Sequence, residues 1–179
     1  SIEKAVRDNG SVPATSEVLK GVLKVGLSLQ EIAELAASQS PRKLSRADFA
    51  ICLAQRATGA TTVAATMIAA ARAGISVFAT GGIGGVHRGV ADSWDISADL
   101  DELARHDVAV VSAGAKSILD LPKTLEVLET KGITVLGYNT DEFPAFFTPK
   151  SGLAGAHRAD TPAEVASILK AKWGLGLEG

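Results

Sequence analysis

The stretch ISVFATGGIGGVHRG, residues 75–89, decides the fold class of this chain. It runs an unbroken apolar segment into a glycine-rich turn, and VAVVSAGAKSILD, residues 108–120, repeats this arrangement with a lysine near its end. Strands that read as continuous apolar runs are covered on both faces, as in parallel sheets. The sequence therefore predicts an α/β protein with a largely parallel sheet flanked by helices.

Predicted helices and strands alternate over residues 59–140, and helical connections of this length join parallel strands through right-handed crossovers. Because no linker or repeat interrupts the pattern, we expect one domain over residues 1–179. We expect this domain to be truncated at both ends; at the first end, SIEKAVRDNG reads as the last turns of a helix. The predicted elements are helix 60–73, strand 75–80, helix 98–105, strand 108–113, helix 122–132 and strand 133–139. Capping patterns predict further helices at Ser28 with Glu31 (helix 29–38), Ser45 with Asp48, and Thr161 with Pro162 and Glu164.

The composition narrows the class of function. With 18 basic and 20 acidic residues, the chain lacks the positive field that nonspecific nucleic-acid binding needs, so a small substrate is expected. No apolar run is long enough to span a bilayer, and no secretory signal begins the sequence, so we expect a cytoplasmic protein without membrane or nucleic-acid partners. The single cysteine, Cys52, lies among apolar residues and is expected to be a buried structural thiol.

The glycine-rich turn at residues 81–85 follows a predicted strand, where ligands of α/β sheets gather. Its backbone amides can hold a phosphate, with Thr80 adding a hydroxyl, although such glycines equally serve a tight turn. The turn fits neither the dinucleotide fingerprint nor the P-loop, because His87 stands at the third glycine position and no Gly-Lys-Ser/Thr follows. His87 and Arg88 are candidates for acid–base and anion-binding roles, or are ordinary loop residues.

The segment WDISADLDELAR, residues 94–105, carries Asp95, Ser97 and Asp99 at alternate positions. These oxygen ligands suit a hard divalent cation, but Ser97 or Asp99 equally suits a helix cap. His106 and His157 lie in polar surroundings and are expected to be solvated loop residues.

Lys116 follows a predicted buried strand. Loss of hydration lowers the pKa of a lysine, and a neutral amine attacks carbonyl carbon. The position therefore favours either a Schiff-base lysine or a plain surface charge.

Taken together, these motifs resemble the pseudouridine-5′-phosphate glycosidase family, also known as indigoidine synthase A-like. The resemblance runs through NGSVPAT, KLSRADFA, GATTVAATM, FATGGIGGVHRG, DISADLDELAR, SAGAKSILDLPKTLEVLET and GYNTDEFPAFF to KAKWGLGLEG. It covers essentially the whole chain.

The resemblance implies reversible cleavage of pseudouridine 5′-phosphate to uracil and ribose 5-phosphate by a homotrimer with bound Mn²⁺. It assigns the nucleophile to Lys116 and the metal ligand to Asp95. It places substrate contacts at Lys43, Val63, Ser97, Ala98 and Asp99, and phosphate or sugar contacts at Thr80 and His87.

The chemistry explains the lysine. Pseudouridine joins its base to ribose through a carbon–carbon bond, so no heteroatom can leave as in ordinary glycosidases. An amine can form an iminium at the anomeric carbon of the opened sugar while uracil departs, with Asp99 or His87 moving protons.

One family feature is absent from these residues: a proton-donating glutamate that the family places before the start of this chain. We therefore expect the chain alone not to turn over at the normal rate. The alternatives are another Schiff-base lyase acting on a phosphorylated sugar and a noncatalytic sugar-phosphate-binding fragment.

Overall fold

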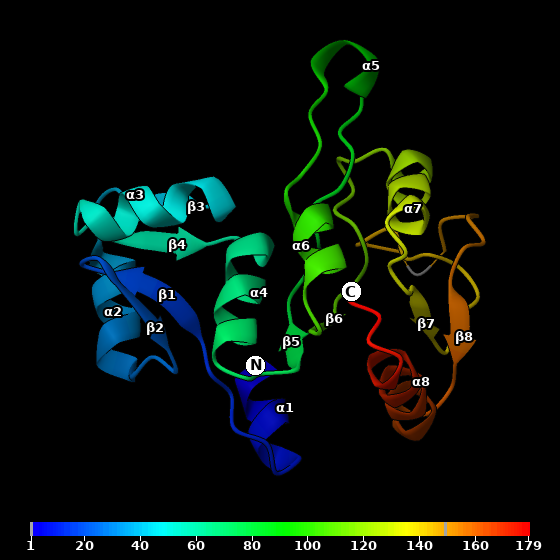
Figure 1. Cartoon of the computed structure of the whole chain (residues 1–179), viewed down its shortest axis with the longest axis horizontal. Helices are drawn as coiled ribbons and strands as arrows, with labels where there is room; N and C mark the ends of the chain where they lie inside the picture. The colour runs from blue at the N-terminus through cyan, green and yellow to red at the C-terminus, as the bar shows by residue number, and fades with distance from the viewer. Residues whose placement is uncertain (1, 149) are drawn as a thin grey trace. The chain divides into compact units, whose positions relative to one another are not determined.

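The computed structural model of the chain describes residues 2–148 and 150–179. The chain divides into two compact units, residues 1–75 and residues 76–179, and each is described by itself. Helices and strands alternate in both units (Figure 1). The predicted α/β class is confirmed.

The first unit is built around a four-stranded sheet in the order β2-β1-β4-β3. Strand β1 pairs antiparallel with β2 and β4, whereas β3 and β4 are parallel. The elements are α1 (Ile2–Asp8), β1 (Ser16–Leu19), β2 (Val22–Val25), α2 (Leu29–Ala37), β3 (Arg42–Leu44), the 3₁₀ helix η1 (Arg46–Asp48), α3 (Phe49–Ala54), β4 (Gly59–Thr61) and α4 (Val63–Arg72).

The hairpin of β1 and β2 was not expected from the sequence. Lys20 and Gly21 form its two-residue turn with φ values of 49° and 79°. Positive φ at both positions is typical of the tight turns that match strand twist. The signal was present in residues 16–25, SEVLKGVLKV, where two short apolar runs flank Lys-Gly.

The core of the first unit forms where β1, β3, α3 and α4 meet. Val18, Leu44, Cys52 and Ala65 are each fully buried in it, which confirms the prediction for Cys52. Helix α4 begins later than predicted because Gly59–Thr61 pair with β3 as strand β4, and the Thr62 side chain then caps the helix by accepting from the Ala65 amide.

The second unit holds two separate pairs of parallel strands, β5 with β6 and β7 with β8. Parallel pairing is as expected, but the strands of the chain are shared among three sheets. The elements are β5 (Val77–Ala79), α5 (Val90–Ser93), α6 (Asp99–Arg105), β6 (Ala109–Val111), α7 (Leu121–Thr130), β7 (Leu136–Tyr138), β8 (His157–Ala159) and α8 (Pro162–Gly174).

The predicted helix caps are present. Ser28 with Glu31 caps α2, and Thr161 with Glu164 caps α8, each through reciprocal side-chain and backbone hydrogen bonds. Ser45 and Asp48 make the same box, but it opens η1 before α3.

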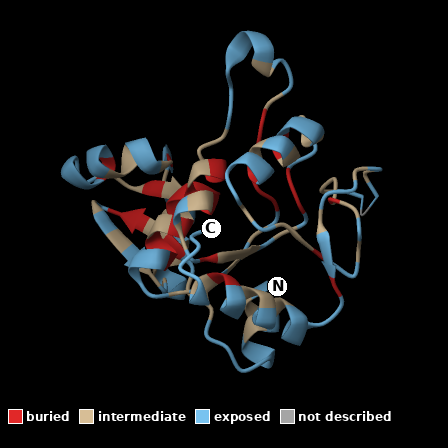
Figure 2. Ribbon diagram, turned by 45° about the vertical axis from the view of Figure 1, so that its right-hand side comes forward, coloured by how far each residue is buried: buried red, intermediate tan, exposed pale blue. Residues whose placement is uncertain are grey.

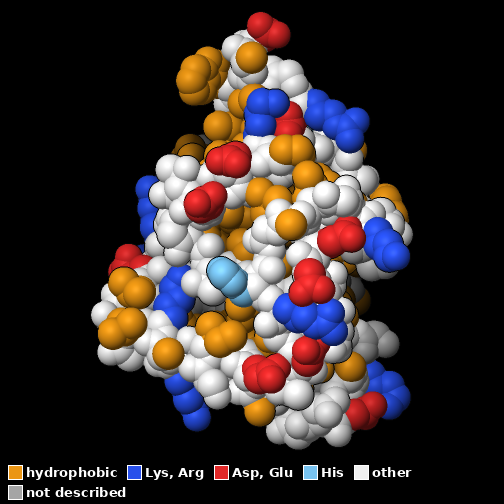
Figure 3. Space-filling view, turned by 90° about the vertical axis from the view of Figure 1, so that its right-hand side faces the viewer, with side chains coloured by type: hydrophobic (Ala, Val, Ile, Leu, Met, Phe, Trp, Pro, Cys, Tyr) orange, Lys and Arg blue, Asp and Glu red, His pale blue; other side chains and the backbone are white. Residues whose placement is uncertain are grey.

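Surface and interior separate as expected for packed helices and strands: exposed residues cover most of the helices, and buried residues gather in short stretches (Figure 2). On the face drawn in Figure 3, acidic and basic side chains are interspersed without a single-sign field. Within the described ranges, no helix has the length and apolar character needed to cross a membrane.

Candidate functional site

A long two-armed loop spanning residues 83–97 carries several predicted site residues of the second unit. Its arms pair through a bridge between Val86 and Ile96, and the Ser97 amide donates to the Gly85 carbonyl at 3.0 Å. Helix α5 sits at its tip, which extends away from β5 and α6 (Figure 1). The glycine turn and the acidic segment are therefore neighbours.

The lysine segment runs beside the same loop. Ala115 is bridged to Ile83, and the Lys116 amide donates to the Ile83 carbonyl at 3.1 Å. Further along, the Asp120 amide donates to the Val86 carbonyl at 2.8 Å. Backbone pairing with the glycine turn thus fixes the position of Lys116, whose side chain is exposed.

Asp99 links the acidic segment to the glycine turn. Its carboxylate Oδ2 accepts a hydrogen bond from the Gly84 amide at 2.8 Å, and the side chain is buried with the residue only 5% exposed. The Asp99 amide donates to Ser97 Oγ at 3.2 Å. A Cβ on Gly84 would lie 2.7 Å from Asp99 Oδ2, so only glycine fits this approach.

Thr124 is a site-building residue that the sequence analysis missed. It is fully buried on α7, where its Oγ1 accepts from the Val86 amide at 3.0 Å and donates to the Asp120 carbonyl at 2.7 Å. It therefore fixes the loop against the segment that follows Lys116. A lone threonine within a helical pattern gave no signal for this role.

Arg88 also braces the lysine segment. Its Nε donates to the Leu119 carbonyl at 3.4 Å, and its Nη2 donates to the Ser117 carbonyl at 3.3 Å. Two of its donors thus serve the backbone on the C-terminal side of Lys116.

His87 and Asp95 face each other across the loop. His87 Nδ1 lies 3.8 Å from Asp95 Oδ2, and the His87 amide donates to the Asp95 carbonyl at 3.0 Å. One imidazole and one carboxylate suit a divalent cation that keeps several waters. In residues 2–148 and 150–179, no group of three or more histidine, cysteine or acidic side chains is placed to hold a metal.

Thr80 and Ala98 occupy the ends of elements. Half-buried Thr80 directly follows β5, and its amide donates to the Val111 carbonyl at 2.9 Å. Ala98 is the N-cap of α6, but Ser97 Oγ accepts a hydrogen bond from the amide of Asp99, the first residue of α6, so the structure supports the alternative capping role for Ser97 and not for Asp99.

Lys43 and Val63 belong to the first unit. Lys43 is exposed in β3 opposite Ala60 of β4, while buried Val63 is the first residue of α4. The Thr62 amide donates to the Leu44 carbonyl at 3.0 Å, which brings the two neighbourhoods together within that unit.

The predictions for two histidines were wrong in part. His106 is not a free loop residue, because its Nε2 lies 2.8 Å from Oε2 of the fully buried Glu102, which also pairs with Arg105. His157 is exposed as expected, but it belongs to strand β8, because it pairs with Leu136.

Comparison with known proteins decides the family. The model of the indigoidine synthase A like protein family matches residues 1–179. The chain belongs to the indigoidine synthase A-like family. The matched residues include both compact units.

Two curated relatives of this family member share a name. It is 60% identical over 179 residues to the pseudouridine-5′-phosphate glycosidase of Solibacter usitatus, and 54% identical over 179 residues to that of Petrotoga mobilis. The match covers all of this chain but 60% and 58% of those proteins, so the chain spans about three fifths of their length.

Solved structures confirm the fold of the family member. Prealnumycin C-glycosynthase AlnA, in complex with ribulose 5-phosphate, matches with a TM-score of 0.95 at 45% identity, over 99% of this chain and 59% of that one. An indigoidine synthase A-like protein from Thermotoga maritima matches with a TM-score of 0.91 at 37% identity, over 98% of this chain and 58% of that one.

Proposed function

We propose that this chain is the lysine-bearing part of an enzyme that reversibly cleaves pseudouridine 5′-phosphate to uracil and ribose 5-phosphate. The observation that carries the proposal is the 60% identity, over all 179 residues, to a relative named for that activity. The geometry supports it, because Lys116, Ser97 and Asp99 all attach to the glycine turn by hydrogen bonds.

In the proposed reaction, Nζ of Lys116 attacks C1′, the C1′–O4′ bond breaks, and O4′ takes a proton. The nitrogen lone pair then forms a C1′=N iminium as the C1′–C5 bond breaks, and its electrons pass to uracil, which is protonated at C5. Water hydrolyses the iminium to release ribose 5-phosphate and the free lysine.

Other residues of the second unit would support these steps. Asp99 and His87 are the proposed proton-transfer groups, and Ser97 and Ala98 substrate contacts. Thr80 and the glycine-turn amides other than those of Ile83 and Gly84, which donate to Gly114 and Asp99, would hold the phosphate, so that remote binding energy positions the sugar. From the first unit, Lys43 and Val63 are proposed substrate contacts.

Mn²⁺ is proposed at Asp95, whose carboxylate is 62% exposed and lies opposite His87. A bound divalent cation would supply positive charge to orient substrate oxygens and water. A homotrimer is proposed on the resemblance alone, and light scattering of the purified protein tests it. A cytoplasmic location is proposed on the sequence composition, in which the single cysteine fits a reducing compartment.

Uracil release tests the function. We expect a chimera of this chain with the segments of the Solibacter usitatus relative outside the match to release uracil from pseudouridine 5′-phosphate. Lys116→Ala should lower the rate by at least about 10³-fold, because the covalent route is lost. Borohydride reduction in the presence of ribose 5-phosphate should add the sugar at Lys116.

The control is Lys170→Ala, which removes an exposed lysine of α8 and should leave the rate within twofold. Uracil release by Lys116→Ala at the unchanged rate would refute the nucleophile. A trapped adduct without uracil release from the chimera would instead identify a different Schiff-base lyase. Retention of ribose 5-phosphate binding with neither adduct nor turnover would indicate a noncatalytic binding module.

C-glycoside synthesis is the second candidate, because a matching structure is that of a C-glycosynthase with bound ribulose 5-phosphate. Incubation with ribose 5-phosphate or ribulose 5-phosphate and uracil distinguishes the preferred sugar in this direction.

A further inference from the structure

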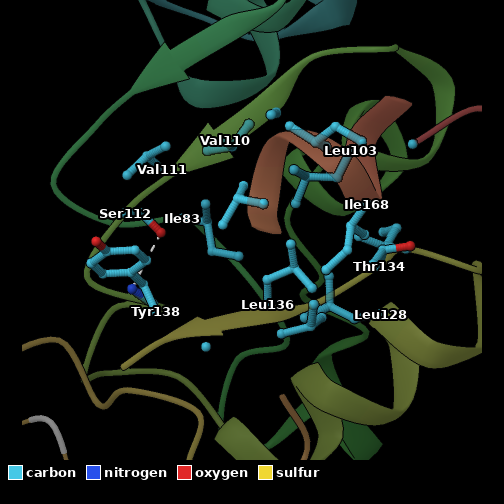
Figure 4. Close-up of a pocket in the computed structure, with 18 of the residues that line it drawn as sticks. Ile83, Leu103, Val110, Val111, Ser112, Leu128, Thr134, Leu136, Tyr138 and Ile168 are labelled. Atoms are coloured by element: carbon cyan, nitrogen blue, oxygen red, sulfur yellow. Dashed lines mark hydrogen bonds between the residues drawn. The ribbon is translucent and has the colours of Figure 1, made fainter. Parts of the chain in front are cut away.

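An apolar cavity of about 540 Å³ lies in the second unit between strands β6 and β7. Ile83, Leu103, Leu128, Leu136 and Ile168 project into it (Figure 4). The glycine turn contributes to the cavity wall only through Ile83, and residues 112–116, between β6 and Lys116, contribute only through Ser112 and Gly114. Most of this cavity is therefore distinct from the proposed substrate site.

The cavity lies at the strand edges. Residues 108–112 all line it, as do residues 133–138. Because successive side chains point to opposite faces of a strand, consecutive residues can line one cavity only when the strand edge borders it. None of the described residues of β5 or β8 lines the cavity. The cavity therefore borders the edge of β6 that faces away from β5 and the edge of β7 that faces away from β8.

The backbone hydrogen bonds of β6 also show that one of its edges is free. Ala109 donates to the Ser76 carbonyl and Val111 accepts from the Thr80 amide, both at 2.9 Å, so these residues face β5. Val110 between them directs its N–H and C=O to the opposite edge.

Strand β7 repeats the pattern. The Val135 carbonyl accepts from His157 and the Asn139 amide donates to Ala159, both at 3.0 Å, toward β8. Leu136 and Tyr138 consequently direct their backbone groups away from β8, to the side of the cavity. Among the described residues, no strand pairs with this edge of β6 or of β7.

We propose that one extended apolar strand, supplied by family polypeptide outside the 179 matched residues, inserts between β6 and β7 and joins the two strand pairs into one sheet. Such a strand satisfies both rows of backbone groups, which are costly to bury unpaired, and its side chains cover the apolar lining. A small apolar ligand would cover the lining but leave both rows unpaired.

Two observations support this occupant over a second copy of the chain. A strand inserted between β6 and β7 needs both of its own edges free, whereas in a second copy β5, β6, β7 and β8 would each already have a partner on one edge. The relatives have the additional polypeptide, since the match covers only 60% of the Solibacter usitatus protein. The inference does not depend on the proposed reaction.

Residue-resolved amide hydrogen exchange tests the proposal. The probe is the polypeptide of the Solibacter usitatus relative outside the match, first added as separate segments and then joined to this chain as a chimera. The amides of Val110, Leu136 and Tyr138 should exchange at least tenfold more slowly in the chimera, while those of Ala109 and Gly137, which face existing partners, change less. Unchanged exchange at the first three amides in the folded chimera overturns the proposal.

A substitution pair tests the groove itself. Val110→Lys places a charge on the lining and should weaken binding of the added segments, or slowing of exchange in the chimera, by at least tenfold. Val77→Lys alters an exposed valine of β5 outside the lining and should change either readout by less than twofold. Equal effects of both substitutions would contradict the proposed seat. Concentration-dependent protection of Val110 without added segments would assign the groove to a second copy instead.

Discussion

At the scale of single residues, the candidate site depends on close approach and burial more than on exposed charge. Asp99 and Gly84 share a hydrogen bond of 2.8 Å in a buried position, and Thr124 closes a second one beside them. These contacts set where the exposed Lys116 and the half-buried His87 emerge.

Gly84→Ala should destabilise the second unit by about 1–3 kcal/mol, because the added methyl group overlaps Ser97 and Asp99. Urea unfolding followed by tryptophan fluorescence measures this, since Trp94 and Trp173 both lie in that unit. The matched control is Gly81→Ala, where an added Cβ meets nothing within 4 Å, with an expected change below about 0.5 kcal/mol. Equal losses would show that the close approach is not what requires glycine.

Lys172 should make the free energy of unfolding depend on pH in the alkaline range. Burial lowers its pKa below the usual 10.5, although its Nζ donates to the Gly132 carbonyl at 3.3 Å and to Thr134 Oγ1 at 3.2 Å. The unfolded state therefore binds more protons between the lowered pKa and 10.5, so the free energy of unfolding contributed by this group rises with pH across that window.

Lys172→Met should flatten this rise in urea titrations at a series of alkaline pH values, because the titrating group is gone. Lys170→Met, at an exposed position of the same helix, should keep the wild-type slope. A wild-type slope in Lys172→Met would refute the assignment.

At the scale of elements, capping defines where helices begin. The Thr161 side chain accepts from the Glu164 amide at 3.2 Å, and Glu164 Oε2 accepts from the Thr161 amide at 3.0 Å. Both bonds satisfy donors that α8 leaves unpaired at its first turn.

Thr161→Ala should cost about 1 kcal/mol of stability through loss of this cap. Thermal or urea unfolding provides the measurement. Ser167→Ala is the control, because Ser167 lies inside the exposed face of α8, where alanine is a better helix former. The cap has no such role if both variants behave alike.

At the scale of the whole molecule, each compact unit has buried side chains of its own. Leu44, fully buried with Cys52 and Ala65, belongs to the first unit, whereas the buried Leu100 and Leu128 belong to the second. Burial of Cys52 also raises the pKa of its thiol, which slows its reaction with thiol reagents.

Leu44→Ala should destabilise the first unit by about 2–5 kcal/mol, because it leaves a cavity in a fully buried cluster. The rate of labelling of Cys52 should rise accordingly, since opening of this core exposes the thiol. Leu29→Ala, at a residue 83% exposed, should change stability by less than about 0.5 kcal/mol and leave labelling unchanged. Equally fast labelling in the wild-type protein would show that this core does not protect Cys52.

The sequence by itself determined the α/β class, the helix starts at Ser28 and Thr161, the buried Cys52 and the segments that carry the candidate site. These follow from local periodicity, capping geometry and glycine-rich turns, whose causes lie within a few residues of each other. Only the tertiary structure decided that Asp99 bonds to Gly84, that Thr124 fixes the loop, and that β6 and β7 have free edges at one cavity. Such contacts join distant or separately folded segments, or depend on which strand edge is left unpaired, and neither is encoded in local spacing.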